Sequence, residues 1–251
     1  GSVYIHEPGF PKEWANAPFT CDWGRAALFR HTVQRKGATF VETATPEPFI
    51  KLTRPTDADV DALSRVYQAS WRGPATFNWA GPDHGYITRV TPTGFKPEPL
   101  PNFDKLTDAE LIKLLESPSH VRTLTAQRTL LRRKKNVATI KSLLALAADG
   151  KKDTGARVAA LFAVTQRGIN SSESGQVIKA ITPLSKDPTL QAFVLRALGD
   201  MGIDQITKGK LGSAPAALFI AGMKSRDART RVEAIIAAAR QKSMETAAAI
   251  A

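Results

Sequence analysis

One helical pattern recurs at regular intervals along the second part of the chain, and few folds accommodate it. A small or β-branched residue followed four positions later by an apolar one occurs at residues 126–130 and, 34 residues later, at 160–164. The pattern recurs after another 34 residues at 194–198, and after a further 40 at 234–238. Helical hairpins of this length, each burying its apolar stripe against its neighbours, are typical of α-solenoids. An ordinary helical bundle with coincidental spacing is the alternative.

Prolines, glycines and aspartates divide this part into short segments with helical spacing of apolar residues. At its start, Thr107 and Glu110 have the spacing of a capping box, in which both side chains bond to the backbone of the first turn. We predict helices over residues 107–116, 119–133, 137–147, 154–167, 174–184, 188–200, 214–223 and 227–242, and the C-terminal residues allow one more. The pattern predicts a HEAT-like helical repeat domain over residues 99–251.

The first part of the chain has a different pattern. Short β-branched or aromatic runs separated by Gly, Pro and Asp predict antiparallel strands. These runs lie at residues 19–24, 27–33, 39–43, 57–61, 65–71 and 85–90. So few strands cannot make a closed barrel or an entire propeller. Residues 92–101 contain four prolines and predict an extended linker. We therefore expect a mainly α protein, a β segment over residues 1–98 preceding the helical domain.

Almost all of the net charge of +12 lies in the second part. Residues 1–100 hold 11 Lys and Arg against 10 Asp and Glu, whereas residues 101–251 hold 24 against 13. A basic surface of this kind attracts nucleic acid, an acidic protein or an anionic surface, or it only keeps the protein solvated. The few aromatic residues of this part lie in apolar contexts, so a nucleic-acid partner is unfavoured because base stacking needs exposed rings.

Catalytic and metal-binding patterns are scarce. The four histidines have no metal-ligand spacing, and Cys21 is the one cysteine, so the sequence offers no zinc site, internal disulfide or haem-attachment motif. Asp57, Asp59 and Asp61 alternate along the chain. They can cap turns and pair with nearby arginines, or hold Ca²⁺. No run of apolar residues is long enough to cross a membrane.

Two groups of residues are candidates for a ligand or partner surface. The first is an aromatic and polar loop before the last expected strand, with Trp71, Arg72, Trp79 and His84. Two interpretations of these side chains are open: they surround a bound ligand, or they anchor the sheet by packing. The second is the basic end of a helix, with Arg128, Arg132, Arg133 and Lys134. Positive charge there complements the helix dipole, and it also suits a phosphate or an acidic partner.

Two stretches carry a resemblance to a known family. The run from Pro55 to Trp71 resembles the blade signature P-T-D-x-x-V-x-x-x-G-x-L-Y-V-x-D-W of propellers similar to quinoprotein sugar dehydrogenases, with Ser64 at the turn glycine and Ser70 at the aspartate. The stretch 111–128, with Ser117-Pro118, Val121-Arg122 and Ala126-Gln127-Arg128, is similar to the start of the HEAT segment that follows this propeller. Together they resemble bacterial membrane-bound-dehydrogenase-like proteins, also called PVC-type haem-binding proteins.

In that family a propeller, HEAT repeats and a cytochrome c module follow one another. The resemblance implies that this chain is a non-catalytic scaffold module for protein–protein interaction, containing the end of a β-propeller. It also implies haem c, and a quinone or Ca²⁺, on parts other than this chain, and a periplasmic or extracellular location. The propeller and cytochrome modules would be its partners. A stand-alone adaptor for an acidic protein and a basic nucleic-acid binder are the alternatives.

Overall fold

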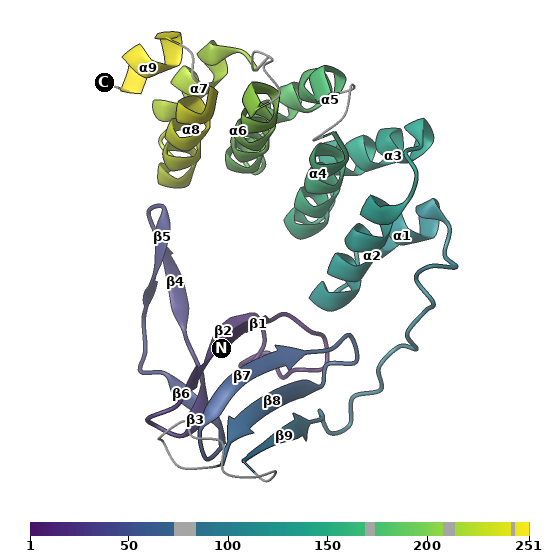
Figure 1. Cartoon of the computed structure of the whole chain (residues 1–251), viewed down its shortest axis with the longest axis vertical. Coiled ribbons are helices and arrows are strands. Elements are labelled where there is room, and N and C mark those ends of the chain that lie inside the picture. Colours follow the sequence, from purple (N-terminus) through teal and green to yellow (C-terminus); the bar gives the residue numbers. More distant parts are fainter. Residues whose placement is uncertain (73–83, 169–173, 208–213, 242–243, 251) are drawn as a thin grey trace. The chain divides into compact units, whose positions relative to one another are not determined.

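A computed structural model describes residues 1–72, 84–168, 174–207, 214–241 and 244–250. The chain is mixed, with small antiparallel sheets followed by many helices (Figure 1). It divides into two compact units. The first unit comprises residues 1–35, 40–102 and 118–122, and the second comprises residues 36–39, 103–117 and 123–251.

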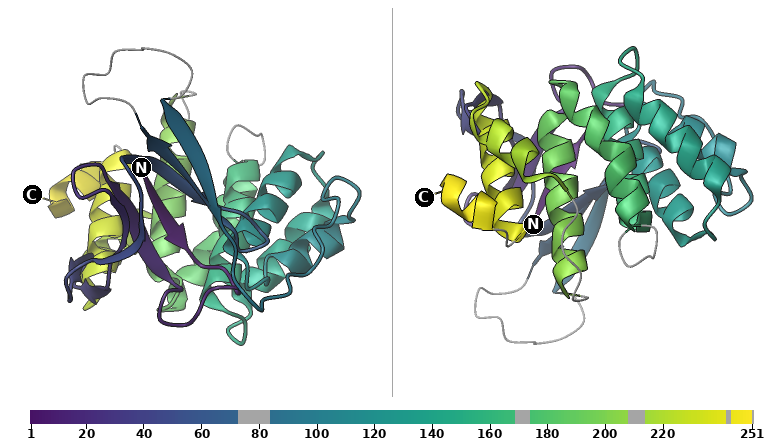
Figure 2. Two further views of the ribbon diagram at one scale, coloured as in Figure 1. Left: turned by 90° about the horizontal axis from the view of Figure 1, so that it is seen from below. Right: turned by 90° about the horizontal axis from the view of Figure 1, so that it is seen from above.

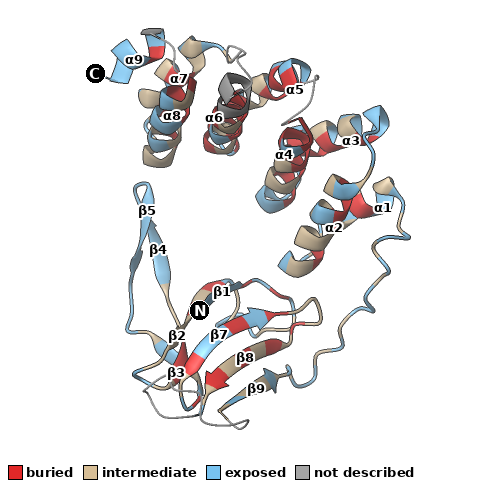
Figure 3. Ribbon diagram, viewed as in Figure 1, coloured by how far each residue is buried: buried red, intermediate tan, exposed pale blue. Residues whose placement is uncertain are grey.

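The first unit contains a four-stranded antiparallel sheet in the order β1-β2-β3-β6. Its strands are β1 (Ser2–Ile5), β2 (Ala17–Asp22), β3 (Ala27–Arg30) and β6 (Glu47–Lys51). A three-stranded antiparallel sheet follows in the order β7-β8-β9, with β7 (Pro55–Val60), β8 (Val66–Trp71) and β9 (Gly85–Val90). The strands β4 (Val33–Lys36) and β5 (Thr39–Glu42) form a separate two-stranded sheet, exposed along its length (Figure 3).

Both larger sheets contribute to one apolar core. Its buried residues are Ile5, Ala17, Phe19, Leu28, Ala58, Val60 and Val66. The alternating burial of β8 follows from the alternation of side chains along a strand, which turns every second residue toward the core. Each stretch predicted as a strand contains one, but β1, β4 and β6 were not predicted as strands.

The proline-rich segment 91–102 has no helix or strand, as predicted. It is nevertheless fastened to the first unit. The guanidinium of Arg122 donates to the carbonyl of Pro99 at 3.1 Å, to that of Glu98, and to that of Ala62 at 3.4 Å. Arg122 is only 5% exposed, so its five donors replace water around these carbonyl groups.

The second unit is helical. Its elements are α1 (Asp108–Leu114), α2 (His120–Arg132, whose first residues belong to the first unit), α3 (Val137–Ala148), α4 (Thr154–Gly168), α5 (Ser174–Ile181), η1 (Thr182–Lys186), α6 (Gln191–Thr207), α7 (Ala216–Met223), α8 (Ala228–Gln241) and α9 (Met244–Ile250). All eight predicted helices are confirmed, with ends displaced by a few residues. The capping box is confirmed too, because the Thr107 side chain accepts from the Glu110 N–H and the Glu110 side chain binds the Thr107 backbone.

The helices of this unit form two layers. Helices α2, α4, α6 and α8 follow one another in one layer, and α1, α3, α5 and α7 follow one another in the other (Figures 1 and 2). Their facing sides make one apolar core that extends from Leu111 in α1 to Ala238 in α8. Within the described residues, none of the helices combines the length and apolarity needed to cross a membrane.

Candidate functional site

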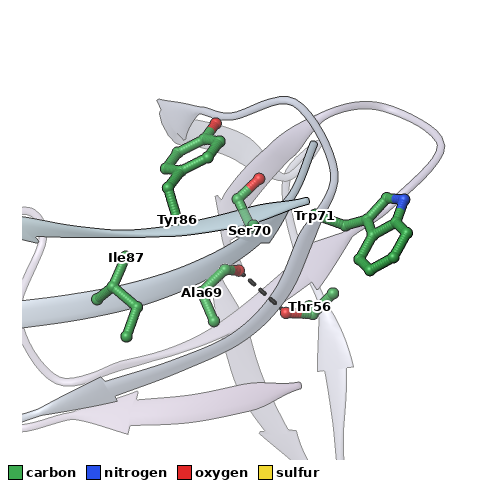
Figure 4. Close-up of a pocket in the computed structure, with 7 residues that line it drawn as sticks. Thr56, Ala69, Ser70, Trp71, Tyr86 and Ile87 are labelled. Carbon is green, nitrogen blue, oxygen red and sulfur yellow. Dashed lines mark hydrogen bonds between the residues drawn. The ribbon is translucent and has the colours of Figure 1, made fainter. Parts of the chain in front are cut away.

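An open hollow of about 360 Å³ lies on the three-stranded sheet, where β8 ends and β9 begins (Figure 4). It is lined by Thr56, Ala69, Ser70, Trp71, Gly85, Tyr86 and Ile87. Because Ala69 pairs with Ile87 and Ser70 with Tyr86, the two pairs point to opposite faces of the sheet. Ile87 is 74% exposed.

The close approach of two strands at the mouth of the hollow favours a glycine. A Cβ atom at Gly85 would lie 3.3 Å from the carbonyl oxygen of Ser70, a tight contact for a side chain. Gly85 therefore lets the start of β9 approach the end of β8. The next pair along, Arg72 and His84, is joined by a hydrogen bond of 2.7 Å from the Arg72 N–H to the His84 carbonyl.

The structure brings together three of the four predicted residues of the aromatic loop. The rings of Trp71 and His84 stack with their centroids 5.7 Å apart and an angle of 24° between planes. Arg72 lies next to both through its backbone. The fourth, Trp79, lies outside the described residues. The two rings thus form a stacked aromatic pair where β8 ends and β9 begins.

A hydroxyl network lies on the other face of the same strands. The Tyr86 hydroxyl is 3.1 Å from the Thr53 N–H donor and 3.1 Å from the Thr53 hydroxyl. The neighbouring Ser70 hydroxyl accepts from the Arg54 N–H at 3.1 Å. Hydrogen bonds from Ser70 and Thr53 lower the pKa of Tyr86 below its usual value because they stabilise the phenolate.

The predicted basic group has mixed roles in the second unit. Arg133 forms an ion pair of 2.8 Å with Asp108 and donates to the carbonyl groups of Asp104, at 3.1 Å, and Leu106. Arg133 is therefore committed to holding the segment before α1. Arg132 is mostly exposed and lies 3.7 Å from a carboxylate oxygen of Asp104. Arg128 and Lys134 are exposed.

The alternating aspartates bind backbone and arginine. Asp61 accepts from the N–H groups of Leu63, at 2.9 Å, and Arg65, at 3.0 Å, and it forms an ion pair of 2.6 Å with the Arg65 guanidinium. Asp57 and Asp59 each accept from the N–H of the following residue. Asp61 thus caps a turn and pairs with an arginine, as one of the two predicted alternatives requires.

Other chemistry is limited. Among the residues that the structure describes, no group of three or more His, Cys, Asp and Glu side chains could hold a metal ion. Burial raises the pKa of the Cys21 thiol, which favours the protonated form and makes it a weak nucleophile.

Several buried charged residues were missed by the sequence reasoning. Arg157 and Arg167 are 3% and 5% exposed, and Glu7 is 3% exposed. Arg157 donates to the Ala147 carbonyl at 3.0 Å and forms an ion pair with Asp187. The signal that could have revealed Arg157 is its place three residues before Ala160, on the apolar side of the helix.

The predicted site residues fall in two different units: Trp71, Arg72 and His84 in the first, and the basic group in the second. Neither a family model nor a curated protein nor a solved structure matches the chain.

Proposed function

We propose that this chain is a non-catalytic scaffold and interaction module, in which a HEAT-like α-solenoid follows the end of a β-propeller. One observation carries the proposal: equivalent side chains link successive helices at the spacing of the sequence repeat. Arg133 and Arg167 are 34 residues apart. Each donates to backbone carbonyl groups of an earlier segment: Arg133 to that of Leu106, just before α1, and Arg167 to that of Leu130, near the end of α2.

The same position in α8 makes a similar link. Gln241 follows Arg167 by two repeats of 34 and 40 residues, and its side-chain amide donates to the Leu198 carbonyl at 3.2 Å. Side chains that bond to the backbone of a preceding helical unit make each unit depend on its neighbour. Such nearest-neighbour dependence is the physical property that defines a solenoid scaffold.

The backbone at Ser64 supports the propeller part of the proposal. Ser64 has a φ angle of +62°, in the left-handed region that favours glycine. It occupies the position at which the blade signature has a glycine. The buried Ser64 hydroxyl accepts from the Gly9 N–H at 3.0 Å, which offsets part of the conformational cost. A four-stranded sheet followed by a three-stranded one is also compatible with successive blades.

The parent protein in this proposal is membrane-bound-dehydrogenase-like and haem-binding, and it lies in the periplasm or outside the cell. The chain would hold a sugar-oxidising propeller near an electron acceptor. Haem c, and a quinone or Ca²⁺, would belong to modules other than this one.

Isolation of the protein from its source cell, with an antibody against residues 99–251, tests this function. We expect material heavier than the 27.1 kDa of this chain, with haem absorbance and sugar-dependent reduction of a dye. The purified chain alone should show neither property. A natural product of 27.1 kDa without associated haem would reject the dehydrogenase-like parent.

A stand-alone adaptor for an acidic protein is the second candidate. Arg128 in α2 and Arg196 in α6 lie two repeats of 34 residues apart, and both are exposed. Equivalent positions share one face of the helical layer, so these charges act on the same side. A nucleic-acid partner would use the same charges. Binding of duplex or single strands that weakens steeply with salt would favour that alternative.

A further inference from the structure

Three large apolar side chains are exposed on one face of α8. Val232, Ile235 and Ile236 are 42%, 43% and 41% exposed. Their spacing places them on one side of the helix, and Ala239 continues that side. The opposite side of α8, with Ala234, Ala237 and Ala238, is buried. An amphipathic surface helix normally exposes polar residues, so this second apolar face needs an explanation.

The sequence repeat explains this second apolar face. Residue 235 follows residue 195 by the same 40 positions that separate the motifs at 194–198 and 234–238. Leu195 is fully buried, and Leu161, another 34 positions earlier, is fully buried as well. Of the three equivalent positions 161, 195 and 235, only position 235 is exposed.

The contacts of α6 show what covers this position. A Cβ atom at Gly222 in α7 would lie 2.9 Å from Leu195, so the two residues are in close contact. A Cβ atom at Gly199 would lie 2.8 Å from the Cα of Ala237 in α8. Leu195 and Gly199 thus face the helix pair that follows. Their equivalents in α8 are Ile235 and Ala239, which face the next position in the layer.

Helix α9 leaves this face largely open. It packs near the end of α8, where the Thr246 hydroxyl donates to the Ala238 carbonyl at 3.2 Å. With α9 in place, Val232, Ile235 and Ile236 keep the exposed fractions given above.

The charges around the face are mainly positive. Helix α8 contains Arg229, Arg231 and Arg240 against one acidic residue, Glu233. Arg240 forms an ion pair with Asp200 of α6, so Arg229 and Arg231 carry the excess positive charge of the helix. The exposed Lys224 and Arg226 lie in the preceding turn. An apolar face bordered by arginines suits a helix with an apolar or small-residue stripe and acidic flanks.

We propose that the face of α8 formed by Val232, Ile235 and Ala239 binds an acidic amphipathic helix of a partner polypeptide, which continues the helical layer. This inference rests on the proposed scaffold function and names its docking surface. The partner helix occupies the place that α8 occupies on α6, with small residues against Ala239 and acidic residues near the arginines.

A peptide of residues 228–241 with Arg229, Arg231 and Arg240 replaced by Glu is a suitable probe. Its alanine side already fits the equivalent face of α6, as Ala237 against Gly199 shows. Fluorescence anisotropy with the full chain measures the affinity. We expect Ile235→Glu to weaken binding at least about tenfold, since it loses apolar burial and adds charge repulsion. Ile235→Ala should weaken it less.

The matched control is Val137→Glu, which adds the same charge at an apolar residue of α3 that is 82% exposed. It should leave the affinity unchanged, and both variants should keep the melting temperature of the parent chain. Equal binding by the Ile235→Glu variant, or no binding of the acidic peptide, would overturn the proposal. So would self-association that Ile235→Glu abolishes, because the occupant would then be a second copy. The haem and mass measurements are unaffected by these outcomes, so the two proposals can fail separately.

Discussion

The Arg167 guanidinium donates to the backbone carbonyl of Lys134 at 2.8 Å, and so joins the end of α4 to the residues that follow α2. The same guanidinium reaches the carbonyls of Arg133, at 3.4 Å, and Leu130. The last carbonyl groups of a helix have no donor within it, and Arg167 supplies one. Burial lowers the pKa of Arg167, yet an arginine stays charged, so its loss leaves several acceptors without a donor.

Replacing Arg167 with Met should therefore lower the free energy of unfolding by about 2–4 kcal/mol. Urea unfolding followed by circular dichroism measures the change. The control is Arg128→Met, an exposed position in α2, which should change stability by less than about 0.5 kcal/mol. Equal effects of the two variants would show that the buried guanidinium has no special role.

Sequence reasoning found the helices because their ends have local causes. The Thr107–Glu110 capping box and the breaks at Gly150 and Pro188 act within a few residues. Strand β6 was missed because Glu47 and Pro48 are poor strand formers, and its place is set by pairing with β3.

The candidate site was predictable only in part. Trp71 and His84 are close to each other in the sequence, and the pairing of β8 with β9 brings them together. Arg122 and Arg167 were missed because arginine is normally exposed, and their partners are distant carbonyl groups that no local pattern marks.

The contribution of Asp187 to the stability of the fold should be lost in acid. The hydrogen bond from Arg157, followed by that from the Thr189 N–H, lowers the pKa of Asp187 below its ordinary value. Its contribution is therefore complete above about pH 4 and is lost as the pH falls through the lowered pKa. Asp187→Asn should be less stable than the parent near neutral pH, and the difference should shrink below about pH 4. Urea midpoints across this range test it, with the exposed Glu13→Gln as a control. A difference independent of pH would contradict the prediction.

The contribution of Glu7 to the stability of the fold should have the opposite pH dependence. Burial raises the pKa of Glu7, although hydrogen bonds from Ser119 and the Val121 N–H act against this shift. Its contribution to stability is present below about pH 4 and is lost as the pH rises through the raised pKa. Glu7→Gln keeps an acceptor for the Val121 N–H, which lies 3.0 Å from the carboxylate, and stays neutral. We expect this variant to gain stability over the parent at pH 7 but not at about pH 4. A loss at pH 7 would show that the carboxylate charge is stabilising.

Tyr86 should be the first tyrosine to ionise. Its pKa is lowered by the hydrogen bonds from Ser70 and Thr53, whereas burial raises the pKa of Tyr4. An alkaline titration followed by ultraviolet absorbance should show an early and a late phase. Tyr86→Phe should remove the early phase, and Tyr4→Phe should remove the late one. An early phase that persists in the Tyr86→Phe variant would exclude the hydroxyl network as its origin.

Gly199 should tolerate no side chain, because α6 and α8 are in close contact there. A Cβ atom would lie 2.8 Å from both the Cα and the Cβ of Ala237, and a backbone atom cannot move aside as a flexible side chain can. Gly199→Ala should therefore lower the free energy of unfolding by about 1–3 kcal/mol despite the better helix propensity of alanine. Gly175→Ala in α5 is the matched control, since a Cβ atom there has no neighbour within 4 Å among the described residues. It should be neutral or stabilising by up to about 1 kcal/mol. Urea unfolding of both variants separates propensity from packing: a stabilised Gly199→Ala would mean that α6 and α8 can move apart at little cost, and that the close contact does not determine how these helices pack.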